Sequence, residues 1–272
     1  METYSLLAQY PAIYVPLAAI IGLVVGSFLN VVVYRLPTML HAEWTLEAQD
    51  FLGLPKDEHA KMSLSRPASA CPCCGRGIKP WENVPVLSYI GLRGKCAGCK
   101  LPISPRYPLV ETLGGVAGAL SFWHFGLSIE ALAFACALWA LITLALIDHD
   151  TMLLPDAIVL PLLWCGLLLT AFTAPDHLAE SVMGAAAGYA VFRILPIGRG
   201  DAKLAAAAGA WLGVWALPFF ITAGAAVAAL IGGVYLLIRK RSAPYPFGPS
   251  LAISFALSIF FSDWYAALLG VK

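Results

Sequence analysis

Residues 204–238 read LAAAAGAWLGVWALPFFITAGAAVAALIGGVYLLI, a run without a single charged side chain. As one helix this run would be about 52 Å long at 1.5 Å per residue, whereas the hydrocarbon core of a bilayer is roughly 30 Å thick. The run is therefore predicted to form a helical hairpin, and Pro218 offers the break between its two helices. A hairpin of two apolar helices indicates a polytopic membrane protein.

The composition extends this prediction to the rest of the chain. Of the 272 residues, 60% are hydrophobic and 12% are charged, and the mean hydropathy is +0.79; a soluble domain carries about 25% charged residues. We predict an all-α polytopic membrane protein with about eight transmembrane helices. The predicted spans are residues 12–33, 108–125, 129–147, 157–174, 178–197, 204–218, 220–238 and 250–269. Breaks are expected at residues 124–128 and 175–177.

Lysine and arginine residues predict the orientation in the membrane. Residues 35–106 contain ten of them. Further basic residues follow the fifth and seventh spans, and in the eight-span arrangement all these groups share one side. The positive-inside rule makes that side cytoplasmic. Three regions follow: a first transmembrane helix in 1–34, a cytoplasmic insert in 35–106, and a transmembrane core in 107–272. With a net charge of +1, the chain offers nothing to nucleic acid; its surroundings are membrane lipid.

The insert contains two Cys-x-x-Cys pairs separated by 21 residues, namely Cys71, Cys74, Cys96 and Cys99. This spacing is typical of a four-thiolate zinc ribbon, in which each pair directs two sulfurs at one ion. Gly75 and Gly98 are expected to permit the tight turns. Disulfides are the alternative, which the reducing cytoplasmic side disfavours. Cys73 is an additional thiol in the first pair, so the ligand set stays open there.

Two acidic residues, Asp148 and Asp201, lie where long apolar segments meet the predicted cytoplasmic face. Ionisable groups near the bilayer are costly and therefore point to function. Two neighbouring carboxyl groups share a proton, so one can act as a base toward water while the other protonates a peptide carbonyl. The structural alternatives are a helix N-cap at Asp201 and, at Asp148, a cap or a pairing with Arg199. Glu111 is a weaker second candidate.

Several runs occur in an order that resembles the bacterial type IV prepilin peptidases of type IV pilus and type II secretion systems. These enzymes are leader peptidases and N-methyltransferases. The matching runs are GSFLNVVVYRLP at 26–37, CPCCG at 71–75, PWENVP at 80–85, CAGCK at 96–100, ID at 147–148 with LPD at 154–156, and GRGDAKL at 198–204. The segment before Gly198 is shorter than this family leads us to expect.

The resemblance implies an aspartic endopeptidase whose catalytic pair is Asp148 and Asp201, with Asp150 and Asp156 as alternatives to Asp148. It implies that the substrates are the N-terminal segments of prepilins or pseudopilins, cleaved after a glycine between a basic cytoplasmic leader and a hydrophobic helix. It also implies methylation of the new N-terminus with S-adenosylmethionine, at a site the sequence does not locate. The expected location is the bacterial inner membrane, with the active site at its cytoplasmic face.

Two other functions fit part of the same residues. A transporter or channel would use Asp148 and Asp201 as proton or cation sites, although such sites usually lie near the midplane of the bilayer. An inactive scaffold would bind pilins through the zinc-binding insert, and Asp→Asn changes would leave its function intact.

Overall fold

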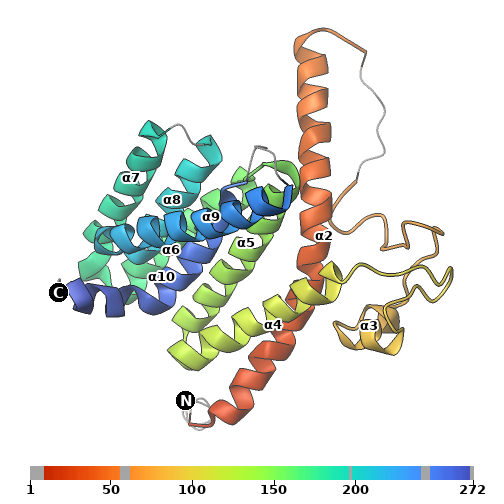
Figure 1. Cartoon of the computed structure of the whole chain (residues 1–272), viewed down its shortest axis with the longest axis horizontal. Coiled ribbons are helices and arrows are strands. Elements are labelled where there is room, and N and C mark those ends of the chain that lie inside the picture. Colours follow the sequence, from red (N-terminus) through yellow and green to blue (C-terminus); the bar gives the residue numbers. More distant parts are fainter. Residues whose placement is uncertain (1–8, 56–61, 196–197, 240–245, 270–272) are drawn as a thin grey trace. The chain divides into compact units, whose positions relative to one another are not determined.

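The computed structural model describes residues 9–55, 62–195, 198–239 and 246–269, and within these ranges the chain is helical with no strand (Figure 1). The all-α prediction is confirmed. The helices are α2 (Pro11–Phe51), α3 (Leu87–Gly91), α4 (Arg106–Phe125), α5 (Ile129–Thr151), α6 (Asp156–Thr173), α7 (Leu178–Ile194), α8 (Arg199–Leu212), α9 (Leu217–Arg239) and α10 (Gly248–Leu269). Short 3₁₀ turns are η1 (Pro80–Asn83), η2 (Pro175–His177) and η3 (Val214–Ala216).

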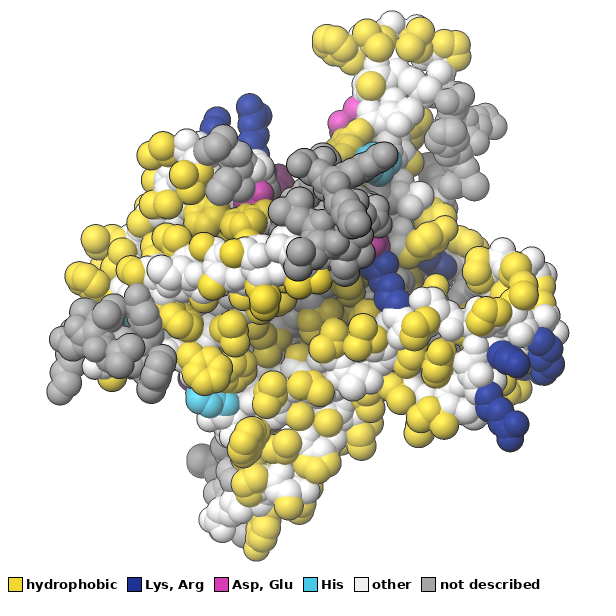
Figure 2. Space-filling view, in the orientation of Figure 1, with side chains coloured by type: hydrophobic (Ala, Val, Ile, Leu, Met, Phe, Trp, Pro, Cys, Tyr) yellow, Lys and Arg dark blue, Asp and Glu magenta, His cyan; other side chains and the backbone are white. Residues whose placement is uncertain are grey.

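Among the described residues, four helical segments are long and apolar enough to cross a membrane. They are Pro11–Phe51, Ile129–Thr151, Asp156–Thr173 and Val214–Val234, and Gly248–Phe261 is a shorter apolar helix. Hydrophobic side chains also cover much of the visible surface (Figure 2). The chain is therefore a membrane protein, while the number of eight spans stays a prediction.

Two helix boundaries differ from the predicted ones. The first span was predicted to end at residue 33, but α2 continues through Pro37 to Phe51. The hairpin predicted to break at Pro218 instead breaks at Gly213, which takes a positive φ of 75°. Pro218 is the second residue of α9, where its missing N–H costs no helical hydrogen bond.

Contacts divide the chain into two compact units, Met1–Trp139 and Ala140–Lys272. In the first unit, α2 and α4 pack with their backbones nearly touching. A methyl group at Gly26 would lie 2.7 Å from the Cα of Glu111, and one at Gly22 would collide with the carbonyl of Gly114. Small residues at a helix crossing allow this approach, which is the usual way in which membrane helices associate.

The insert is attached to these helices through two buried side chains. Arg35 of α2 donates hydrogen bonds to the carbonyls of Ser63, Leu64 and Pro67, and it is 9% exposed. Glu111 of α4 accepts a hydrogen bond of 2.7 Å from the Val86 N–H. Glu111, a weak functional candidate from the sequence, thus makes a structural contact.

In the second unit, α8 is enclosed by its neighbours. Its residues from 204 to 210 are all buried, most of them alanines, and α6, α7 and α10 pack against it. A methyl group at Gly184 of α7 would lie 2.5 Å from the Gly209 carbonyl oxygen, so α7 and α8 also pack backbone to backbone. Trp211 of α8 donates a hydrogen bond of 2.7 Å to the Leu162 carbonyl of α6. The middle and the end of α8 are therefore packed tightly within the unit.

Candidate active site and metal centre

Asp148 lies at the end of α5, one residue after the fully buried Ile147. Its side chain is turned inward, because the residue is only 6% exposed. The backbone N–H of Gly248, the first residue of α10, donates a hydrogen bond of 2.8 Å to its Oδ2 atom. The partner of Asp148 is thus a backbone group 100 residues away. This arrangement differs from the cap or the Arg199 pairing considered from the sequence.

Asp201 lies in the first turn of α8 and is 9% exposed. It is not the N-cap of this helix, because Gly198 occupies that position. The side chain instead folds back toward Gly198, where a methyl group would lie 2.8 Å from Oδ2. Gly200 packs on Leu154, so a methyl group there would lie 2.9 Å from the Leu154 Cβ. Both glycines permit close contacts that place the acid against the unit's interior.

The two aspartates belong to the same unit and are close enough for their carboxyl groups to interact electrostatically. Both are buried, although 53 positions separate them in the sequence. Two buried carboxyl groups that interact can share one proton, which is the state that an aspartic peptidase needs before water attacks. The geometry therefore supports paired acid–base chemistry.

The two alternatives to Asp148 occupy different surroundings. Asp150 is exposed to solvent. Asp156, at the start of α6, is exposed as well and forms a bidentate ion pair with Lys203 of α8, with Nζ–O distances of 2.6 and 2.7 Å. Neither has the burial that Asp148 shares with Asp201.

The four predicted zinc ligands come together in the first unit. The Sγ atoms of Cys71, Cys74, Cys96 and Cys99 all lie within 4.8 Å of one another, and those of Cys71 and Cys99 are 3.9 Å apart. Four sulfurs at about 2.3 Å from a tetrahedral zinc ion would be about 3.8 Å apart, so the cluster fits this metal. All seven cysteines are free thiols, and Cys73 is exposed and lies outside the cluster.

Both halves of the cluster have the same backbone pattern. The N–H of Gly75 donates to the Cys71 carbonyl at 2.9 Å, and the N–H of Lys100 donates to the Cys96 carbonyl at 3.0 Å. Each donor has a positive φ, 69° at Gly75 and 63° at Lys100. The turn expected at Gly98 is therefore made by Lys100. Gly98 instead packs closely on the Arg76 side chain, since a Cβ there would lie 3.1 Å from Cδ of Arg76.

Neighbouring groups shift the pKa values of Cys71 and Cys99 in opposite directions. Hydrogen bonds from the backbone of Cys74 and then Cys73 lower the pKa of the Cys71 thiol to about 6. For Cys99, the backbone of Leu101 lowers the pKa, but burial and the neighbouring thiols outweigh it and raise the value to about 11. Such a cluster readily supplies one thiolate, and a divalent cation would favour the others.

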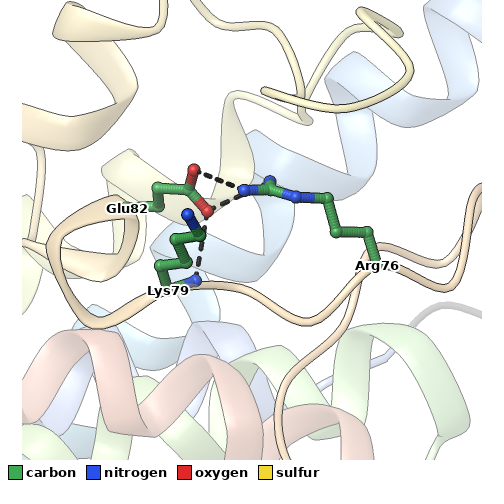
Figure 3. Close-up of polar contacts among 3 residues, drawn as sticks. All are labelled: Arg76, Lys79 and Glu82. Atoms are coloured by element: carbon green, nitrogen blue, oxygen red, sulfur yellow. Dashed lines mark hydrogen bonds and ion pairs between the residues drawn. The ribbon is translucent and has the colours of Figure 1, made fainter.

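An ion pair supports the first cysteine pair (Figure 3). Arg76, two residues after Cys74, forms two hydrogen bonds of 2.9 and 3.1 Å with the carboxylate of Glu82 in η1. The Lys79 N–H donates to the same carboxylate at 3.1 Å. The Arg76 guanidinium and this N–H hold the pKa of Glu82 below its usual range. The η1 turn is thereby tied to the cysteine cluster.

The sequence did not single out Gly248, which contacts Asp148, or Arg35, which holds the insert. The signal for Gly248 was present, because a Gly-Pro pair opens the last apolar run and proline is common in the first turn of a helix. For Arg35, the signal was a single cation at the end of an apolar run, which also fits a simple membrane-interface residue.

Comparison with known proteins finds two matching family models and several similar proteins. Residues 20–125 match the Bacterial Peptidase A24 N-terminal domain, and residues 135–235 match the Type IV leader peptidase family. A prepilin leader peptidase/N-methyltransferase of Pseudomonas putida is 45% identical over 276 residues, covering 97% of this chain and 96% of the relative. Proteins of the same name from Pseudomonas aeruginosa and Neisseria gonorrhoeae are 42% and 44% identical, covering 97% and 93% of this chain and 96% and 92% of the relatives. No solved structure matches the chain.

Proposed function

The chain belongs to the type IV leader peptidase family, and from this premise we propose that Asp148 and Asp201 are its catalytic pair. The chain is a prepilin-processing enzyme that removes the leader peptide and methylates the new N-terminus. The transporter and scaffold hypotheses are therefore not retained. One observation carries the catalytic assignment: the carboxyl groups at the end of α5 and the start of α8 are both buried in one unit, and the charge of Asp148 acts on Asp201.

The peptidase chemistry follows from one proton shared by the two acids. The ionised carboxylate takes a proton from a water molecule, whose oxygen attacks the scissile carbonyl carbon. The neutral carboxyl group gives its proton to the carbonyl oxygen, which yields a tetrahedral gem-diol. Protonation of the amide nitrogen then breaks the C–N bond and releases the leader and a free amine. Burial of both acids favours a state in which one is ionised and the other neutral.

The substrate geometry supports a site at a membrane face. Asp148 and Asp201 lie at the ends of apolar helices, and a prepilin is cut where its hydrophobic helix begins. We place this site at the cytoplasmic face of the bacterial inner membrane, because the basic insert and the basic residues near Gly198 predict that orientation. Prepilin or pseudopilin N-terminal segments are the partners, and lipid surrounds the helices.

Two cofactors complete the proposal. Cys71, Cys74, Cys96 and Cys99 would hold one zinc ion with a structural role, because a closed set of four thiolates has no open coordination position. S-adenosylmethionine would supply the methyl group for the second activity, and the residues that bind it are not assigned.

The test is a cleavage assay with purified protein in detergent and a synthetic prepilin, read by mass spectrometry. Asp148→Asn and Asp201→Asn keep the size of each side chain but remove the acid, so leader removal should fall to background in both. Asp150→Asn is the matched control, since it makes the same change at an exposed position two residues away and should cleave normally.

Methylation of a pre-cleaved pilin peptide with S-adenosylmethionine controls for folding, because that step needs no peptide hydrolysis. Cleavage by Asp148→Asn together with its loss in Asp150→Asn would transfer the catalytic role to Asp150. Normal cleavage by Asp201→Asn would remove Asp201 from the site.

A further inference from the structure

Helix α10 begins directly against the carboxylate of Asp148. Gly248 is buried, and its N–H donates to Oδ2 of Asp148 at 2.8 Å. A methyl group at Gly248 would lie 2.7 Å from that oxygen and 2.9 Å from the carboxyl carbon. Cβ atoms in proteins essentially never lie within 3.0 Å of such a neighbouring atom. Only glycine can present this N–H to the acid without displacing it.

Of the first backbone N–H groups of α10, it is that of Gly248 which donates to Asp148. The next residue, Pro249, has no N–H. The following two N–H groups, of Ser250 and Leu251, donate to the Phe247 carbonyl at 3.0 and 3.2 Å. The N-terminus of a helix also favours negative charge, so the contact suits a carboxylate.

Gly248 is held in place independently of Asp148. Leu251 and Phe255, further along α10, are fully buried, and the hydroxyl of Ser254 donates to the Phe220 carbonyl of α9. The Phe247 ring lies 6.4 Å from that of Phe192 in α7. The donor therefore belongs to a rigid part of the unit, and the acid is oriented against it.

We propose that Gly248 is a positioning residue for peptide cleavage, because its backbone N–H and its lack of a side chain fix the orientation of the Asp148 carboxylate. The bond fixes Oδ2 against the start of α10 and thereby sets the direction in which Oδ1 points. This inference rests on the catalytic role proposed for Asp148. Gly248 itself touches no reacting atom.

Gly248→Ala tests the proposal. The new methyl group displaces the carboxylate, and a misplacement of about 1 Å can cost on the order of 10²-fold in rate. We expect kcat for prepilin cleavage to fall by about that factor, while KM stays within about twofold because substrate binding is unchanged. The matched control is Gly224→Ala in α9, where the new methyl group would meet Ser254 at an ordinary 3.5 Å and kcat should not change.

A second variant separates the hydrogen bond from crowding. Replacing Gly248 by glycolic acid turns its amide into an ester, which removes the N–H and adds no atom to the contact. A kcat loss in this ester variant, with normal methylation of a pre-cleaved pilin peptide, supports the positioning role. Wild-type kcat in the ester variant overturns it, as does a parallel loss of cleavage and methylation. Full cleavage by Asp148→Asn would instead refute the catalytic assignment, whatever Gly248 does.

Discussion

At the scale of single residues, each of the two proposed catalytic acids contacts a glycine. Asp148 accepts a hydrogen bond from Gly248, and Asp201 folds back on Gly198. Burying a carboxyl group without polar partners costs several kcal/mol, so such contacts are needed to keep an acid inside a helical unit. A backbone partner cannot rotate away as a long cationic side chain can. The site is therefore organised in advance of substrate binding.

The cysteine cluster gives the first residue-scale prediction. Cys96→Ser replaces a thiolate with a hydroxyl, a poor ligand for zinc, so the purified protein should fall from one bound zinc per chain to well below one. Cys73→Ser is the matched control, because Cys73 is exposed and lies outside the cluster, and it should keep one zinc per chain. Elemental analysis of both purified proteins measures the difference.

Full zinc in Cys96→Ser, or zinc loss in Cys73→Ser, would contradict the four-thiolate assignment. Cleavage per folded molecule should persist in Cys96→Ser, since the proposed chemistry uses no metal ligand. Melting of the protein should occur at a lower temperature, because metal binding contributes to the folding of a small insert.

The side chains of the candidate sites could be proposed from the sequence, whereas the backbone groups that contact them could not. Cysteine pairs and acids at span ends have few other roles, so Cys71 and Asp201 stood out in a chain with 12% charged residues. The N–H of Gly248 has no signature of its own, because its role comes from a contact made across 100 residues. The same holds for Lys100, which takes the turn that a glycine was expected to make.

At the scale of helices, an ion pair joins the starts of α6 and α8. Lys203 lies two residues after Asp201, and its ammonium group contacts both carboxylate oxygens of Asp156. The side chains are 34% and 52% exposed, so water weakens the attraction. The pair thus adjusts the position of the first turn of α8 without dominating its stability.

Asp156→Asn should therefore lower the cleavage rate by no more than about fivefold, since an exposed pair is worth about 0.2–1 kcal/mol, or a factor of about 1.4 to 5. The exchanged pair, Asp156→Lys with Lys203→Asp, should recover most of the rate because it restores the attraction. Glu180→Gln in α7 is the control, as it removes an exposed carboxylate that contacts His177 and should leave the rate unchanged. A loss by Asp156→Asn as large as that of Asp201→Asn would make Asp156 part of the catalytic machinery instead.

Helix positions followed from hydropathy, but helix ends depended on packing and turn geometry. The apolar runs predicted the long helices because a bilayer demands such segments. The end of α8 at Gly213 was not predictable from composition, since Pro218 was the more obvious interruption. The continuation of α2 to Phe51 also escaped prediction, because proline inside a helix usually marks its end.

At the scale of the whole molecule, the predicted topology places the insert and both aspartates on the same side of the membrane. Between the insert and Asp148 the chain crosses twice, through α4 and α5, if each helix spans the bilayer. Between Asp148 and Asp201 it crosses twice again, through α6 and α7. The turn at η2, between α6 and α7, must then lie on the opposite side. The predicted orientation makes the insert cytoplasmic.

Thiol labelling of bacterial cells checks this topology. In spheroplasts, a membrane-impermeant maleimide should label Asp176→Cys in η2, carried in a Cys73→Ser background, because residue 176 is exposed and the predicted topology places it outside. The exposed Cys73 of the unaltered protein should be labelled only after lysis. Mass spectrometry of the labelled peptides separates these sites from Cys136 and Cys165 in α5 and α6. Labelling of Cys73 in intact spheroplasts would reverse the orientation and place both aspartates away from the cytoplasm, where a basic leader would not reach them.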